Sequence, residues 1–327
     1  MKKYVLGVDG GGTKTHYALY NIENNSLKII EGGAANHEVM EGGFDQLEQV
    51  LNDMLSIICN DAGINLSDIN MSVFGLAGVD TKAQHKIISE IITKIGIKDF
   101  VLCNDSYLGI KAGCEKGYGI CANNGTGFTV SAIDTKGDMI QIGGQGYFTG
   151  DNGGGSAMIT TAVCKVYEQL YKLGEETMLK DLIFSEYNIV DKSTFTEIIT
   201  KKLENDYKDA VLTIGKHLYE AANSNDKIAL DILYDVGVEY GKSICGAINE
   251  LNFNGYCQVI MTGSQFVKGS NPRAKETMKA YVQNKCPNYM FDFKLLKQSC
   301  SMGAILWALE KLGMKDEHYE NVLKCFG

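Results

Sequence analysis

The stretch that decides the fold is residues 4–20, YVLGVDGGGTKTHYALY. An apolar run ends at Asp9, three glycines follow at 10–12, and beyond Lys14 apolar residues return at roughly every second position. A period of two is typical of a strand, so the glycine turn joins two strands rather than a strand and a helix. We therefore predict a β-hairpin with consecutive glycines in its turn.

This glycine turn is a candidate phosphate site. Glycines have no Cβ, so their backbone N–H groups can approach an anion closely, and the threonine and lysine that follow add a hydroxyl and a cation. A Walker A loop and a dinucleotide fingerprint are both excluded by the spacing, while an ordinary hairpin turn remains the alternative. Asp9 supplies a carboxylate suited to a hydrated Mg²⁺. The residues predicted to bind phosphate are Gly10, Gly11, Gly12, Thr13 and Lys14.

Length and composition restrict the function classes. A chain of 327 residues exceeds what one core usually supports, so two domains are expected. The net charge of −9, without a block of Lys or Arg, argues against nucleic acid and anionic membranes as partners. No segment has the length of a membrane span, and no secretion signal precedes Asp9, so we expect a cytoplasmic protein. The ten cysteines form no C-x-x-C pair, which favours buried, reduced thiols.

Periodicity predicts an α/β domain over residues 1–116. Helical spacing of apolar residues indicates helices over 44–62 and around 87–95, while short apolar runs indicate strands at 71–76 and 100–103. Strands that alternate with helices are typical of α/β architecture.

A second strand, glycine turn and strand begin at residue 119. Its layout repeats that of residues 4–20, which suggests a second domain over 117–327 that faces the first with its own phosphate turn. The last helices could belong to either domain, and packing on the N-terminal one is left open. The later segments are predicted as helices over 156–182, 194–204, 208–223 and 226–251, a strand over 258–261 and a helix over 301–312.

The order of these motifs resembles the actin-like ATPase and sugar kinase superfamily, and more narrowly its N-acetylglucosamine kinase branch, grouped with the BadF/BadG/BcrA/BcrD ATPases. The motifs recur in the family's order up to about residue 308. They are DGGGTK at 9–14, Asn36-His37, Asn104-Asp105, GTG at 125–127, GGQG at 143–146 with Gly150-Asp151, TGS at 262–264 and SMGA at 301–304.

The resemblance implies two actin-like ATPase (ribonuclease H-like) domains with a nucleotide cleft between them and a helical insertion in the second. It also implies an ATP- and Mg²⁺-dependent sugar kinase, often dimeric, that converts N-acetylglucosamine to its 6-phosphate. Such enzymes bring the two phosphate turns together by closing the cleft, so we expect a hinge motion.

Asp105 is the candidate catalytic residue. It follows the strand at 100–103, and a carboxylate at that end of a strand faces the crevice where α/β proteins bind ligands. There it could accept the proton of a sugar hydroxyl, but from position alone it could equally cap the helix that follows. The resemblance matches Asp105 to the family's catalytic aspartate.

The remaining site residues are assigned by the resemblance, because turn or capping roles would explain them equally well. Sugar binding is implied for Asn36, His37, Asp105 and Asp151. Contacts to the γ-phosphate are implied for Gly125, Thr126 and Gly127, and contacts to adenosine for Gly263 and Ser264.

Three residues depart from the family pattern, namely Phe128, Gln145 and Asn152. Relatives usually have serine, tryptophan (in the animal type) and glutamate there, so we expect these positions, which surround the predicted sugar pocket, to affect sugar choice. A side chain smaller than tryptophan at 145 would admit N-acetylmuramic acid, and glucosamine is a third candidate substrate.

Two other function classes are weighed against the kinase. An ATPase activator of the 2-hydroxyacyl-CoA dehydratase type would hold an iron–sulfur cluster, but Cys103, Cys114 and Cys121 lack the glycine-rich contexts of its cluster ligands. A sugar-sensing regulator would carry an added DNA-binding helix pair, and no such pair is predicted before the strand at Tyr4. The kinase remains the favoured interpretation.

Overall fold

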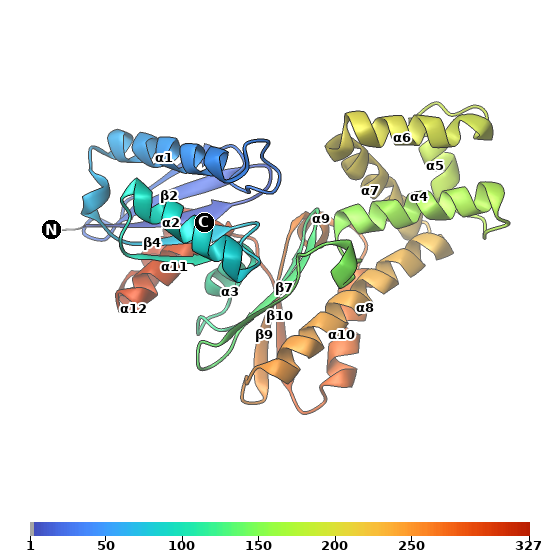
Figure 1. Cartoon of the computed structure of the whole chain (residues 1–327). Coiled ribbons are helices and arrows are strands. Elements are labelled where there is room, and N and C mark those ends of the chain that lie inside the picture. The colour runs from blue at the N-terminus through green and yellow to red at the C-terminus, as the bar shows by residue number, and fades with distance from the viewer. Residues whose placement is uncertain (1–2) are drawn as a thin grey trace.

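Two five-stranded sheets organise the chain in the computed structural model, which describes residues 3–327 (Figure 1). Their strand orders are β3-β2-β1-β4-β5 and β10-β9-β6-β7-β8. In each sheet the first three strands pair antiparallel, and two later strands add parallel to the first. The two sheets therefore share one topology, and the predicted α/β class is confirmed. The start of the segment searched for a secretion signal, residues 1 and 2, lies outside the described residues.

The first sheet contains β1 (Tyr4–Gly10), β2 (Thr15–Asn21), β3 (Leu27–Gly32), β4 (Ile69–Leu76) and β5 (Phe100–Cys103). One of its faces is covered by α1 (Gly43–Ala62) and α2 (Lys82–Ile95) (Figure 1). Helix α1 buries Leu47, Leu51 and Leu55, which lie four residues apart and so share one face of the helix.

The second sheet contains β6 (Gly119–Asn124), β7 (Phe128–Ile133), β8 (Met139–Gly143), β9 (Tyr256–Thr262) and β10 (Met290–Leu295). Helices α8 (Lys227–Glu250) and α10 (Arg273–Lys285) pack together beside it. The insertion between β8 and α8 forms a helical layer on the side away from the first sheet (Figure 1). It consists of α4 (Gly155–Tyr171), α5 (Met178–Glu186), α6 (Phe195–Asn205) and α7 (Tyr207–Asn223).

The prediction of one helix over residues 156–182 is wrong. Helix α4 ends at Tyr171, because Leu173 adopts a positive φ of 55° and the Gly174 amide donates to the carbonyl oxygen of Glu168 at 3.0 Å. A new helix, α5, starts where the Thr177 side chain accepts from the amide of Leu179 at 3.2 Å. A residue with positive φ and then an N-cap residue separate the two helices, although the helical spacing of apolar residues continues from one helix into the next.

Two helices lie between the sheets, α3 (Ser106–Gly113) and α11 (Cys300–Lys311). Helix α11, from the end of the chain, packs on β1 and β4, whereas α3 packs on β6, β7 and β9. Helix α11 lies very close to β1, because a Cβ added at Gly7 of β1 would be only 2.8 Å from the Cβ of Ala304 in α11. Helix α12 (Lys315–Phe326) also returns to the first sheet, where His318 Nδ1 lies 3.1 Å from the hydroxyl of Tyr20. The domain limits at 116 and 117 stay a prediction.

Across residues 3–327, none of the helices combines the length and the apolar character needed to cross a bilayer.

Candidate active site

The carboxyl ends of the first sheet bring two predicted site residues together. Asp9 on β1 and Cys103 on β5 both lie opposite Gly75 of β4, and Asp105 follows Cys103 by two residues. Asp80, in the loop after β4, adds a third carboxylate whose charge acts on Asp105. The sheet edge therefore holds three acids from three separate segments.

Burial changes the proton affinity of these acids. Desolvation, followed by the nearby charges of Asp9 and Asp80, raises the pKa of Asp105 to about 7. Desolvation also raises the pKa of Asp9 to about 6, although His16 and Lys14 oppose this rise. A carboxylate with a pKa near neutrality is suited to accept and release a proton under ordinary conditions.

The Asp105 side chain does not cap the helix that follows it. Asp105 occupies the N-cap position of α3, but its side chain makes no capping hydrogen bond. The neighbouring Asn104 does so instead, because its Oδ1 accepts from the backbone amide of Ser106 at 3.0 Å. Asn104 rather than Asp105 thus makes the capping hydrogen bond of α3, although the backbone amides of Ser106 and of Asp105 itself act against the larger effect of burial on the pKa of Asp105.

The first glycine turn is accessible at its tip. Gly11 donates its amide to the carbonyl oxygen of Lys14 at 3.0 Å, which closes the β1–β2 hairpin, and residues 12–14 are exposed. The Lys14 ammonium lies 3.0 Å from Glu31 Oε2 on β3, an oxygen that His16 also contacts at 3.1 Å. Glu31 was not predicted, and a bound phosphate would compete with it for Lys14.

The second glycine turn rests on the start of α4. The carbonyl oxygens of Gly125 and Thr126 accept from the amides of Gly155 and Ser156 at 2.9 and 3.0 Å. These bonds fix the turn between β6 and β7, while Thr126 and Gly127 are exposed.

Gly263 packs directly against this second turn. It precedes α9 (Ser264–Lys268) with a φ of 85°, and a Cβ there would overlap the carbonyl group of Asn124. The predicted adenosine residues Gly263 and Ser264 therefore adjoin the predicted phosphate turn. Asn124 Oδ1 is buried there with no hydrogen-bond partner, so a polar group in need of a donor lies beside the turn.

The Asn36–His37 loop lies beside the first turn. A Cβ at Gly12 would be 3.9 Å from Asn36 Nδ2, and the His37 ring stacks on Phe44 with centroids 4.0 Å apart. Burial lowers the pKa of His37, which keeps its imidazole neutral, and His37 Nδ1 is buried without a hydrogen-bond partner.

Asp151 is held within its own loop. Its carboxylate accepts from the amide of Gly146 at 2.6 Å and from Thr149 Oγ1 at 2.9 Å. Both contacts shape the loop, so Asp151 would have to exchange or share them to bind a sugar.

The three departures from the family pattern differ in their surroundings. Gln145 and Asn152 are exposed, whereas Phe128 is buried in the core of the second sheet, 4.4 Å between centroids from Tyr240. That position 128 borders the sugar pocket stays a prediction. Phe128 supports the loop, because Cβ atoms at Gly143 and at Gly153 would press on its ring.

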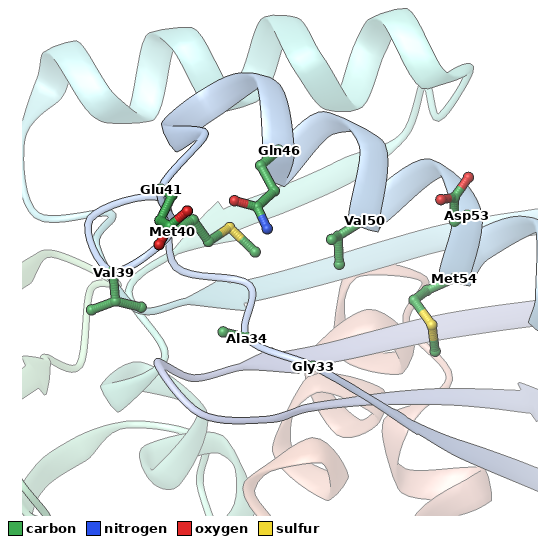
Figure 2. A pocket seen from close by; sticks show the side chains of 9 residues that line it. All are labelled: Gly33, Ala34, Val39, Met40, Glu41, Gln46, Val50, Asp53 and Met54. Atoms are coloured by element: carbon green, nitrogen blue, oxygen red, sulfur yellow. The ribbon is translucent and has the colours of Figure 1, made fainter. Parts of the chain in front are cut away.

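An open hollow of about 490 Å³ lies between the 33–41 segment and α1 (Figure 2). Its lining residues are Gly33, Ala34, Val39, Met40, Glu41, Gln46, Val50, Asp53 and Met54. None of the predicted site residues is among them, nor is any of the three acids at the sheet edge.

The donor set fits a hydrated Mg²⁺ rather than a metal caged by protein. In the part of the chain that the structure describes, no group of three or more His, Cys, Asp or Glu side chains is placed to hold a metal ion. Mg²⁺ bound with a nucleotide usually keeps several waters and takes one or two carboxylates, and Asp9 at the end of β1 can supply one.

Comparison with known proteins gives a consistent result. The BadF/BadG/BcrA/BcrD ATPase family model matches residues 6–308. An N-acetylmuramic acid/N-acetylglucosamine kinase from Clostridium acetobutylicum is 23% identical over 270 residues, which cover 82% of this chain and 87% of that protein. An N-acetyl-D-glucosamine kinase from Dictyostelium discoideum is 21% identical over 335 residues, covering 94% and 98%.

Among solved structures, a protein from Chromobacterium violaceum assigned as an N-acetylglucosamine kinase superposes with a TM-score of 0.68. It is 19% identical, and the match covers 93% of this chain and 98% of that one, so the likeness extends over the whole fold. The resemblance found in the sequence motifs is confirmed: the chain is a member of the BadF/BadG/BcrA/BcrD ATPase family.

Proposed function

We propose that the chain is an ATP-dependent amino-sugar kinase. It transfers the γ-phosphoryl group of ATP to a hydroxyl of N-acetylglucosamine, yielding the 6-phosphate, and accepts N-acetylmuramic acid as a second substrate. The observation that carries the proposal is the desolvated carboxylate of Asp105 at the sheet edge that also bears Asp9 and the first glycine turn. The activities named for its two relatives support the same class of substrate.

In this proposal Asp105 accepts the proton of the attacking sugar hydroxyl. Phosphoryl transfer needs in-line positioning and charge stabilisation more than covalent help, and the remaining residues supply these. Backbone amides of the turns at 10–14 and 125–127 hold the phosphates, while Gly263 and Ser264 contact the adenosine. Asn36, His37 and Asp151 hold the sugar. Mg²⁺, bound through water near Asp9, would neutralise charge on the phosphates.

The three cysteines weighed as cluster ligands argue against an activator ATPase. Cys103, Cys114 and Cys121 are buried, and each has its pKa raised by burial. A cluster shared between two subunits needs thiolates at a surface, so these three cannot provide it. We further propose a homodimer in the cytoplasm, which sedimentation of the purified protein and cell fractionation would test.

The test is a coupled assay of ADP release over N-acetylglucosamine, N-acetylmuramic acid, glucosamine and glucose. We expect the N-acetylated amino sugars to stimulate release, and Asp105→Asn to lower it by about 10²–10⁴-fold while nucleotide binding persists. The control is Asp138→Asn, an exposed aspartate in the turn between β7 and β8.

Each failure has its own meaning. Release stimulated by none of the sugars would refute the kinase, and full activity in Asp105→Asn would refute the assigned base. Turnover of N-acetylglucosamine without N-acetylmuramic acid would remove the second substrate alone.

A further inference from the structure

Asp80 connects the two sheets at the candidate site. It lies between β4 and α2, and its Oδ1 accepts from Asn104 Nδ2 at 2.9 Å and from Gln141 Nε2 at 2.6 Å. Asn104 directly precedes Asp105, whereas Gln141 belongs to β8 of the second sheet. One carboxylate oxygen therefore joins the backbone next to the proposed base to the other half of the molecule. We refer to these two hydrogen bonds as the Asp80 bridge.

The bridge is fixed on both sides. On the first sheet, the Asp80 amide donates to Gln84 Oε1 at 3.1 Å, which ties it to the first turn of α2. On the second, Gln141 Nε2 also lies 3.3 Å from the carbonyl oxygen of Gly143. Gly144 has a φ of 85°, and a Cβ there would be 2.9 Å from Gln141 Nε2. The loop that carries Asp151 thus begins in contact with the bridge.

The environment of Asp80 is costly for a carboxylate. Burial raises its pKa, and the hydrogen bonds from Gln141 and Asn104 act in the opposite direction. The negative charge of Glu38 raises this pKa further. A half-buried acid costs free energy unless donors compensate it, and both donors here come from segments next to proposed sugar contacts. Asp80 is thus placed where the base, the Asn36–His37 loop and the 143–151 loop meet.

We propose that Asp80 is a positioning residue for phosphoryl transfer. Through Asn104 it orients the backbone that presents Asp105, and through Gln141 it holds the 143–151 loop against the first sheet. It exchanges no proton with the sugar. This inference rests on the proposed function, since the segments it aligns are those assigned to the acceptor.

The first test compares three variants in the ADP-release assay with N-acetylglucosamine. Asp80→Ala removes the shared acceptor, and Gln141→Leu removes the donor of the second sheet. We expect each to lower kcat by about 10–100-fold, because a small misplacement of reacting groups has an effect of that size. Asp80→Asn keeps an oxygen in the same place and should recover most of kcat.

The coupling between the two substitutions distinguishes a positioning role of the Asp80 bridge from a merely structural one. In the double variant Asp80→Ala with Gln141→Leu, the loss should be no larger than in Asp80→Ala alone, because Asp80→Ala already removes the contact that Gln141→Leu breaks. Nucleotide affinity and the unfolding midpoint should stay near those of the wild type. Met139→Leu, an exposed change on the same strand, is the control. Multiplicative losses, or a drop in nucleotide affinity as large as that in kcat, would overturn the proposal.

Hydrogen–deuterium exchange provides a readout that does not depend on turnover. In Asp80→Ala, amides of residues 104–108 and 143–151 should both exchange faster than in the wild type, while those of α8 should not change. Unaltered exchange in both segments would refute the bridge even if the chain proves to be a kinase. If the wild type turns over no sugar, the proposed function fails, and faster exchange in both segments would still support the link.

Discussion

At the residue scale, the protonation of Asp105 sets the expected pH dependence. Its pKa is raised to about 7, so the carboxylate form required of a general base is lost as the pH falls through that value. We expect kcat/KM for the sugar to decline about tenfold per pH unit well below the pKa. A pH–rate profile measures this, and constant activity down to about pH 5.5 would contradict it.

Gly263 allows a second test at this scale. Ala at 263 must adopt a φ of 85° and would also overlap the carbonyl of Asn124. We expect Gly263→Ala to weaken nucleotide binding and to lower the free energy of unfolding by more than the ~1–3 kcal/mol that so sparsely populated a backbone conformation costs. Urea unfolding and nucleotide titration measure the two effects.

Gly137→Ala is the matched control for Gly263→Ala. Gly137 has a φ of 89°, but a Cβ there would meet nothing within 4 Å. The Gly137→Ala variant should lose only the unfolding free energy that the positive φ costs an alanine, and it should bind nucleotide normally. Equal behaviour of the two variants would mean that close packing at 263 is unimportant.

Position relative to strand ends explains which site residues could be predicted. Asp9 and Asp105 stand at the ends of clear apolar strands, so the sequence indicates that they lie at one sheet edge. Asp80 and Gln141 were missed because their significance depends on a contact between different sheets. A lone Asp before Thr81 and a helix resembles an ordinary helix start. The signal that could have found Asp80 is the one used for Asp105, an acid shortly after a buried parallel strand.

At the element scale, α3 and α11 are joined by an ion pair between a buried lysine and a partly exposed glutamate. Lys111 Nζ contacts both carboxylate oxygens of Glu310 at 2.8 and 2.9 Å and lies 5.0 Å from the centroid of the Trp307 ring. The Lys111 side chain is only 6% exposed, and burial lowers its pKa. Its charge therefore depends on Glu310.

We expect Glu310→Gln to lower the free energy of unfolding by about 1–3 kcal/mol, because it leaves a buried ammonium without its counter-charge. The double variant Lys111→Met with Glu310→Leu should recover most of this loss, since it removes both charges. Urea unfolding of the three proteins checks this. A double variant less stable than Glu310→Gln would show that the ion pair itself contributes net stability.

The predictability of elements followed their burial pattern. Helix α1 was predicted at 44–62 and spans Gly43–Ala62, because its apolar stripe is continuous. The edge strands β3 and β10 were not predicted as ranges, since they are half-buried and carry mixed polar and apolar residues. An edge strand is specified by its neighbour, which a single sequence does not reveal.

At the scale of the whole molecule, each sheet packs against a helix that follows a strand of the other sheet. Helix α3 follows β5 and packs on the second sheet, whereas α11 follows β10 and packs on the first. Helix α11 covers β1 and β4, so a chain that ends at Gln298 would leave that face of the first sheet uncovered. We expect such a truncated chain to aggregate, because the exposed face is apolar. Sedimentation and dye binding measure this, with truncation after Gly313, which removes α12 alone, as the milder comparison. A monodisperse product ending at Gln298 would contradict the expectation.

The late position of α11 also affects how the chain is made. The strands of the first sheet leave the ribosome early, but the helix that seals one side of that sheet begins at Cys300. During most of its synthesis, the nascent polypeptide must carry an unsealed β-layer. The helix at residues 300–311 is therefore translated long after the sheet it covers, and holding chaperones have the greatest opportunity to bind this protein before that helix emerges.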